Sequence, residues 1–246
     1  MSAPRLYVPG LDPRIARISL SEGESHHVMR VLRLRPGDHV RVFDGEGREW
    51  TAQLAPAERR GLARVEHLEP VDAAREPLVR VTLGAGILKG DHMDAVVRDG
   101  TMMGAVGIVP LPTDLVTVPQ KAWQGTAALE RWRRVAIASA KQCGRALVPG
   151  IAPPTDLEAV IRQHLGSTMI MFVEPSADAS AVAVSDIAVP RQEALVLVGP
   201  EGGWSAGEVS AARAAGVHLV RLGPRTIRSD AMAAVSLAAL WAVWKI

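Results

Sequence analysis

The chain has 246 residues, with 28 lysines and arginines against 26 aspartates and glutamates, so its formal net charge at pH 7 is +2. A hydrophobic content of 48% excludes an intrinsically disordered chain, and a single cysteine excludes a disulfide framework or a thiolate metal cluster built from this chain alone. The longest apolar stretch, Ala231–Trp244, is shorter than the roughly 20 residues that span a bilayer, and the first residues lack a signal-peptide pattern, so we expect a cytoplasmic protein without a membrane segment.

The first 70 residues predict a small β-barrel. We expect a short helix over His26–Arg33 and strands over His39–Asp44, Glu49–Leu54 and Leu62–Leu68, where apolar and polar residues alternate. The Asp44-Gly45-Glu46-Gly47 stretch predicts a hairpin turn, because glycine accepts positive φ angles. Several short strands joined by tight turns are typical of a barrel.

A boundary follows, since Glu69–Pro77 is polar, carries two prolines and shows no periodicity. We place the domains at residues 1–72 and 73–246. After the boundary, strands and helices alternate. We expect strands over Leu78–Leu88, Val106–Pro110, Met169–Val173, Ala194–Val198 and Val217–Leu222. We expect helices over Asp91–Met103 and Ala127–Cys143, and three more that begin at capping boxes at Thr155–Glu158 and Ser205–Glu208 and at a cap at Ser229. This alternation predicts an α/β domain with a parallel sheet and helices on both faces.

Two loops in the second half of the chain combine glycine and proline after a strand. In the first, Gly199-Pro200-Glu201-Gly202, backbone groups can approach a ligand closely, and ligands bind at the carboxyl ends of parallel strands. The loop contains a glutamate and no lysine, which favours a neutral or cationic ligand over a phosphate; a tight turn without a ligand is the alternative. The second, Leu222–Ser229, carries Arg225 and Arg228, either to meet an anion or to pair with Asp230 or Glu201.

Two helical features suggest partners. Arg131, Arg134, Lys141 and Arg145 are spaced three, seven and four residues apart, so they share one helix face, which is either solvated or meets an anionic partner. Ala231–Trp244 is apolar on every side, which indicates a buried helix or a subunit interface.

Two further patterns are weaker evidence for a binding site. Gly84-Ala85-Gly86 resembles the start of a dinucleotide fingerprint, but Lys89 stands at the third glycine position. His26-His27 and Asp91–Asp94 have no convergent partners at a recognised metal-ligand spacing, so we expect no metal site.

Taken together, LVLVGPEGGWS at 195–205 and RLGPRTIRSDA at 221–231 resemble the knotted α/β methyltransferases called SPOUT, and within them the 16S ribosomal RNA (uracil-N3) methyltransferase family. HHVMRVLRLRPGDHVRVFDGEG at 26–47 resembles that family's N-terminal barrel, and AKQCGR at 140–145 its central helix. The resemblance implies S-adenosyl-L-methionine as cofactor, methylation of N3 of a uridine in 16S rRNA of the small ribosomal subunit, a PUA-like RNA-binding domain, a trefoil knot and a homodimer through the knot domain.

The resemblance also implies roles for individual residues. The cofactor pocket is expected to comprise Leu197, Val198, Gly199, Pro200, Glu201, Gly202, Leu222, Gly223 and Ile227. The proton on N3 of uracil must be lost before methylation, and a fixed arginine can favour the anion; Arg228 is the first candidate and Arg145 the second. RNA phosphates are expected to meet Arg5, Arg30, Arg33, Arg131, Arg134 and Lys141.

The chain departs from the family pattern in two places. Thr101-Met102-Met103-Gly104 stands where the family has Thr-Glu-Leu-Gly, and Arg228-Ser229-Asp230-Ala231-Met232 stands where it has Arg-Thr-Glu-Thr-Ala. Three alternatives therefore stay open: an RNA-binding ribosome-assembly factor of the same fold without methylation, a methyltransferase acting on another RNA, and a dinucleotide-dependent enzyme using Gly84 and Gly86.

Overall fold

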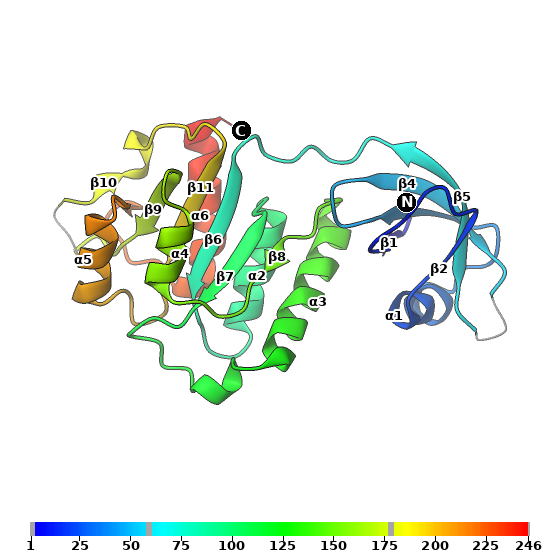
Figure 1. The fold of residues 1–246 in the computed structure, drawn as a ribbon, viewed down its shortest axis with the longest axis horizontal. Coiled ribbons are helices and arrows are strands. Elements are labelled where there is room, and N and C mark those ends of the chain that lie inside the picture. The colour runs from blue at the N-terminus through cyan, green and yellow to red at the C-terminus, as the bar shows by residue number, and fades with distance from the viewer. Residues whose placement is uncertain (1–2, 58–60, 177–179, 246) are drawn as a thin grey trace. The chain divides into compact units, whose positions relative to one another are not determined.

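A computed structural model describes residues 3–57, 61–176 and 180–245, and Figure 1 shows the course of the chain. Its contacts define two compact units, one of residues 1–76 with 140–148 and one of residues 77–139 with 149–246. The sequence gives no sign that residues 140–148 join the first unit. The functional domain limits at 1–72 and 73–246 stay a prediction, because contacts define compactness and not function.

The first unit is built on a five-stranded sheet curled around its own core. The strand order is β1 (Arg5–Tyr7), β3 (His39–Phe43), β4 (Glu49–Ala55), β5 (Arg64–Val71) and β2 (Arg17–Ser19). The core includes Leu6, Val28, Val42 and Val65, all fully buried. The three expected strands are confirmed as β3, β4 and β5. The edge strands β1 and β2 were not predicted, because three residues are too few to show an alternating pattern.

The helix expected over His26–Arg33 begins earlier. Helix α1 covers Glu22–His26 and continues as a π-helical turn over His27–Val31. The Ser21 side chain accepts a hydrogen bond from the Glu24 backbone N–H at 3.2 Å, which fixes the helix start. Arg33 lies beyond the turn with φ at 55°.

The second unit contains a seven-stranded sheet in which every pair is parallel, as predicted. The order is β10 (Val182–Ala183), β12 (His218–Arg221), β9 (Thr168–Phe172), β11 (Glu193–Val198), β6 (Arg80–Gly86), β7 (Gly107–Leu111) and β8 (Gly150–Ile151). The two-residue strands β8 and β10 were not predicted.

Helices cover both faces of this sheet (Figure 1), also as predicted. Helices α4 (Leu157–Gln163) and α5 (Ala206–Ala214) pack against the side chains of one face. Helices α2 (His92–Met102) and α6 (Ser229–Trp244) pack together on the other. Gly100 lets α2 lie close to the sheet, because a Cβ there would be 3.0 Å from Leu83 in β6 and 3.2 Å from Ile108 in β7. Helix α3 covers Thr126–Cys143, and 3-10 turns cover Gln120–Ala122 and Val184–Asp186.

Of the three side-chain helix caps expected in the second unit, one is confirmed. The Ser205 hydroxyl accepts from the Glu208 backbone N–H while Glu208 accepts from the Ser205 backbone N–H, which is a complete capping box. The box at Thr155–Glu158 is wrong: Asp156 is the N-cap residue, and the Thr155 hydroxyl donates to the Pro153 carbonyl. The cap at Ser229 is wrong by one residue, because Arg228 occupies the N-cap position without a side-chain cap bond.

Within the described ranges, no helix is both long and apolar enough to span a membrane, and no group of three or more histidine, cysteine, aspartate and glutamate side chains could hold a metal ion.

Candidate functional site

The second unit carries a cavity of about 460 Å³ at the carboxyl ends of β9, β11 and β12. This is the edge of the sheet at which open parallel sheets bind their ligands. Its walls come from the loops after these three strands and from the first residues of α2 and α6. The lining residues are His92, Phe172–Pro175, Gly199–Trp204, Val209, Leu222, Arg225–Asp230 and Met232.

The structure brings most of the expected cofactor residues together at this cavity. Gly199, Pro200, Glu201, Gly202, Leu222 and Ile227 line it. Leu197 and Val198 are buried in β11 and do not line it, and Gly223 borders a second, shallow hollow with Pro175, Arg221 and Pro224.

Sequence reasoning missed several lining residues, notably Phe172–Pro175, His92 and Trp204. A signal was available for Phe172–Pro175, because they form the end of the buried strand β9 and the start of the loop after it, at the sheet edge that carries the other loops. His92 carried no such signal, since its position depends on how α2 begins.

The loop Gly199–Ser205, here called the glycine loop, is tied to two of its neighbours through side chains. Glu201 Oε1 accepts a hydrogen bond from the Lys89 backbone N–H at 3.2 Å and lies 3.8 Å from His92 Nδ1. Trp204 Nε1 donates to the Phe172 carbonyl at 2.9 Å. The loop is therefore fixed to the loops that follow β6 and β9.

Gly84 and Gly86 serve packing between β6 and β11. A Cβ at Gly84 would lie 2.6 Å from Leu197, and a Cβ at Gly86 would lie 2.4 Å from the Pro200 backbone nitrogen. The two glycines let β11 and the glycine loop lie directly against β6. This role accounts for the Gly-Ala-Gly pattern without a dinucleotide.

Arg228 lies at the rim of the cavity with 75% of its side chain exposed. Its guanidinium donates to both carboxylate oxygens of Asp230, at 3.0 and 2.9 Å, so the ion pair considered for this loop is formed. Because Asp230 lies in the first turn of α6, the pair holds the arginine beside the cavity.

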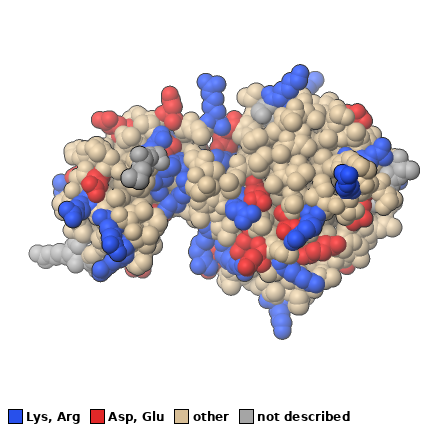
Figure 2. All heavy atoms as spheres, turned by 180° about the vertical axis from the view of Figure 1, so that it is seen from behind, with Lys and Arg blue, Asp and Glu red and all other residues tan. Residues whose placement is uncertain are grey.

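The cavity has a mixed electrostatic lining. Glu174, Glu201 and Asp230 contribute carboxylates, and Arg225 and Arg228 contribute guanidinium groups. Such a lining fits a zwitterionic or cationic ligand with an anion beside it. Elsewhere on the second unit, the face drawn in Figure 2 shows acidic and basic side chains close together.

The stripe expected on α3 is largely paired with acids. Arg131 donates to Asp94 at 2.6 Å and to Asp91 at 2.5 Å, and these hydrogen bonds raise its pKa. Lys141 lies 2.8 Å from both carboxylate oxygens of Glu24. Arg134 is exposed and donates to the Glu130 carbonyl.

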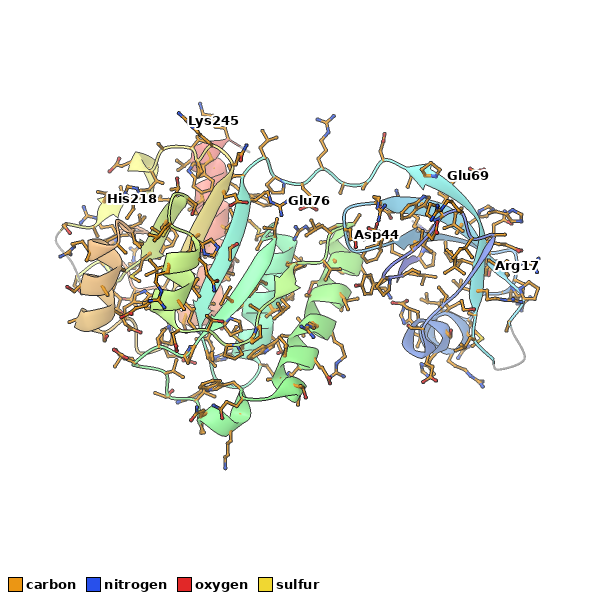
Figure 3. The ribbon with its side chains drawn as sticks, viewed as in Figure 1. Arg17, Asp44, Glu69, Glu76, His218 and Lys245 are labelled. Atoms are coloured by element: carbon orange, nitrogen blue, oxygen red, sulfur yellow. The ribbon has the colours of Figure 1, made fainter. Side chains whose placement is uncertain are left out.

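Arg145 lies beyond the end of α3, outside the cavity lining and with only 6% of its surface exposed. Its guanidinium donates to Glu76 at 2.5 to 3.1 Å; Glu76 is labelled in Figure 3. The pair with Glu76 engages the guanidinium, and a catalytic role for Arg145 stays a prediction.

Arg5 is similarly enclosed in the first unit. It pairs with Glu49 at 2.9 Å and donates to the carbonyls of Ala140, Lys141 and Arg145 at 2.7, 3.3 and 3.0 Å. Arg30 and Arg33 are both exposed on or beside the π-helical turn of the same unit. These two and Arg134 are exposed and form no ion pair within the part of the chain that the structure describes. Arg131 is also exposed but is paired with Asp91 and Asp94.

Comparison with known proteins assigns the chain to a family. A family model described as RNA methyltransferase domain matches residues 74–241, and one described as RNA methyltransferase PUA domain matches residues 20–66. Ribosomal RNA small subunit methyltransferase E of Synechocystis is 32% identical, over 91% of this chain and 72% of the relative. The chain belongs to the ribosomal RNA small subunit methyltransferase E family.

Other similar proteins align with this chain over almost its full length. The Mycobacterium bovis protein is 30% identical over 98% of this chain and 92% of its own. The crystal structure of the Neisseria gonorrhoeae protein bound to S-adenosyl methionine is 28% identical with a TM-score of 0.87, covering 99% of this chain and 98% of that one. A Legionella pneumophila structure with SAM bound is 26% identical, with the same TM-score and 98% coverage of both chains.

Proposed function

We propose that this protein transfers a methyl group from S-adenosyl-L-methionine to N3 of a uridine in the 16S rRNA of the small ribosomal subunit. The observation that carries the proposal is the cavity between the glycine loop and Leu222–Asp230, with an arginine at its rim. Family membership supports it, because the relatives are named as small subunit rRNA methyltransferases and two similar structures hold the same cofactor.

The residues present fit this cofactor. A cavity of about 460 Å³ is of the size that holds small ligands. Phe172, Val173, Trp204 and Leu222 give it apolar walls for a purine ring, while the glycines leave backbone groups open for polar contacts. Glu174 and Glu201 suit the positive charge of a sulfonium and an amino group. When bound, the cofactor supplies an electrophilic methyl group and is left as the neutral thioether.

Arg228 is proposed as the catalytic residue. The N3 proton is lost to solvent before N3 attacks the methyl carbon, so negative charge first develops on the uracil ring. The carbon–sulfur bond then breaks as the carbon–nitrogen bond forms. A guanidinium at the rim stabilises the charge on the ring, and Asp230 holds the guanidinium in one orientation. The remaining contribution is to align methyl group and nucleophile, for which a fixed loop is suited.

The RNA is proposed to contact the exposed arginines Arg30 and Arg33 of the PUA-like domain, and Arg134 of α3. Arg131, Lys141 and Arg5 would reach RNA only by leaving their acidic partners. Two alternatives remain behind this proposal: an assembly factor of the same fold without methylation, and a methyltransferase acting on another RNA. The packing of Gly84 and Gly86 leaves nothing to favour a dinucleotide enzyme.

We further propose a cytoplasmic homodimer with a trefoil knot in the second domain. The knot is proposed from the resemblance of the Leu222–Asp230 loop and the glycine loop to those of the knotted methyltransferases. The dimer is supported by α6, where the apolar residues Val235, Ala238 and Ala242 are exposed.

The reaction is tested with unmodified small ribosomal subunits. We expect the protein to transfer labelled methyl from S-adenosyl-L-methionine and mass spectrometry of the nucleosides to detect 3-methyluridine. Labelled RNA containing a different methylated nucleoside would favour another target. Binding of RNA without transfer would favour the assembly factor.

The dimer is tested at Val235, which is 36% exposed on α6. We expect Val235→Glu to convert the dimer to monomer, because a charge buried in an apolar interface lacks a partner, as measured by light scattering after gel filtration. Val189→Glu, at an exposed valine outside α6, is the matched control and should leave the dimer intact. Leu240 is unsuitable for this test, because it is fully buried within its own subunit and a charge there would unfold the chain. A Val235→Glu protein that stays dimeric would contradict the proposed interface.

A further inference from the structure

A segment outside the cavity lining also contacts the glycine loop. The segment that follows β7, residues 112–116, lies against it: a Cβ at Gly202 would be 2.9 Å from both the carbonyl oxygen and the Cβ of Leu115. Neither Asp114 nor Leu115 lines the cavity, so their contacts with the loop serve something other than direct ligand binding.

Two hydrogen bonds join this segment to the start of α5, and a third lies within the α5 cap. The Ser205 hydroxyl donates to Asp114 Oδ2 at 2.6 Å. The Asp114 backbone N–H donates to Glu208 Oε1 at 3.0 Å, and Glu208 Oε2 accepts from the Ser205 backbone N–H at 2.8 Å. Ser205 and Glu208 also form the capping box of α5. The aspartate therefore extends a local helix cap into a link between two loops that lie about 90 residues apart in the chain.

The link completes a set of anchors around the glycine loop. Glu201 is bound to the Lys89 backbone, Trp204 to the Phe172 carbonyl, and Ser205 to Asp114. Lys89 follows β6, Phe172 is the last residue of β9 and Asp114 follows β7, so the loop is tied to the ends of three strands. A loop already fixed in its ligand-binding shape loses less conformational freedom when the ligand binds.

We propose that Asp114 is a positioning residue that fixes the glycine loop for the cofactor through Ser205. The inference rests on the proposed function, since it concerns the affinity of the same cavity for S-adenosyl-L-methionine. The hydrogen bond to Ser205 uses a carboxylate oxygen, and an asparagine can offer an amide oxygen in its place. The two substitutions Asp114→Ala and Asp114→Asn therefore separate loss of the link from loss of the charge.

The experiment measures cofactor binding to the full-length protein by calorimetry, together with kcat and KM for S-adenosyl-L-methionine. We expect Asp114→Ala to raise Kd and KM about tenfold and to leave kcat at saturating cofactor unchanged, because the reacting groups are not altered. Asp114→Asn should recover most of the affinity. The double variant Asp114→Ala/Ser205→Ala should be no worse than Ser205→Ala alone, since both act through one hydrogen bond.

Asp186→Ala is the matched control. Asp186 also accepts from a serine hydroxyl, that of Ser185 at 3.2 Å, and from a backbone N–H, that of Ala183 at 3.3 Å, but it lies outside the cavity lining. We expect its Kd to equal that of the unaltered protein. An Asp114→Ala protein with unchanged Kd, or one that weakens binding only as much as Asp186→Ala does, would overturn the inference alone. Failure of the unaltered protein to bind S-adenosyl-L-methionine would instead overturn the proposed function.

Discussion

Replacing Gly86 by alanine is expected to weaken cofactor binding by about 10- to 100-fold. The added Cβ would lie 2.4 Å from the Pro200 backbone nitrogen, 2.5 Å from Pro200 Cδ and 3.0 Å from the Gly199 carbonyl carbon. No side-chain rotation relieves a contact with backbone, so the glycine loop must move away from β6. Overpacking of this kind costs about 1–3 kcal/mol, and each 1.4 kcal/mol corresponds to a factor of ten in affinity. Calorimetric titration with S-adenosyl-L-methionine measures the change.

Gly107→Ala provides the control for this prediction. Gly107 lies in β7, and a Cβ there would meet its nearest atoms at 3.6 Å or more, which is ordinary contact. We expect this variant to bind the cofactor normally. If Gly86→Ala bound as tightly as the unaltered protein, the glycine loop would not form the cofactor site.

Replacing Arg228 by alanine is expected to lower kcat by about 100- to 1000-fold, the usual effect of removing one group that stabilises developing charge. The Kd for S-adenosyl-L-methionine should change little, because an arginine with 75% of its side chain exposed at the rim adds little to binding of the cofactor itself. Single-turnover methyl transfer to small subunits at saturating RNA separates the chemical step from binding.

Two further variants qualify the result for Arg228. Asp230→Asn removes the charge that holds the guanidinium, so we expect a smaller loss of kcat in the same direction. Arg162→Ala removes an exposed arginine of α4 that pairs with Glu158 outside the cavity, and its kcat should be unchanged. Equal kcat for Arg228→Ala and the unaltered protein would remove Arg228 from the mechanism.

The sequence predicted the sheet and the glycine loop because both are local patterns. Buried strands such as Glu193–Val198 show as continuous apolar runs, and the glycines and proline after them mark the turn. A local pattern failed at Thr155, where the sequence predicted a capping box. Its backbone N–H donates to Pro110 and its hydroxyl to Pro153, so neither takes part in the capping box that works at Ser205.

The partners of the basic residues could not be predicted, because they are distant in the chain. Lys141 pairs with Glu24, 117 residues away, and Arg131 pairs with Asp94, 37 residues away. On another face of α3, Trp132 and Ala136 are buried. Spacing says nothing of what the basic face meets, and three of its four residues, Arg131, Lys141 and Arg145, form ion pairs in the fold.

The end of α3 has a consequence for the folding of the first unit during synthesis. Residues 140–148 complete the first unit: Arg5 binds the carbonyls of Ala140 and Arg145, and the Val148 backbone N–H donates to the Gly45 carbonyl. Until they are synthesised, Glu24 lacks Lys141 and Glu76 lacks Arg145. At about 5–20 residues per second, the 72 residues from 76 to 148 take roughly 4 to 14 s to translate. During that interval the first unit stays on the ribosome without the residues that complete it.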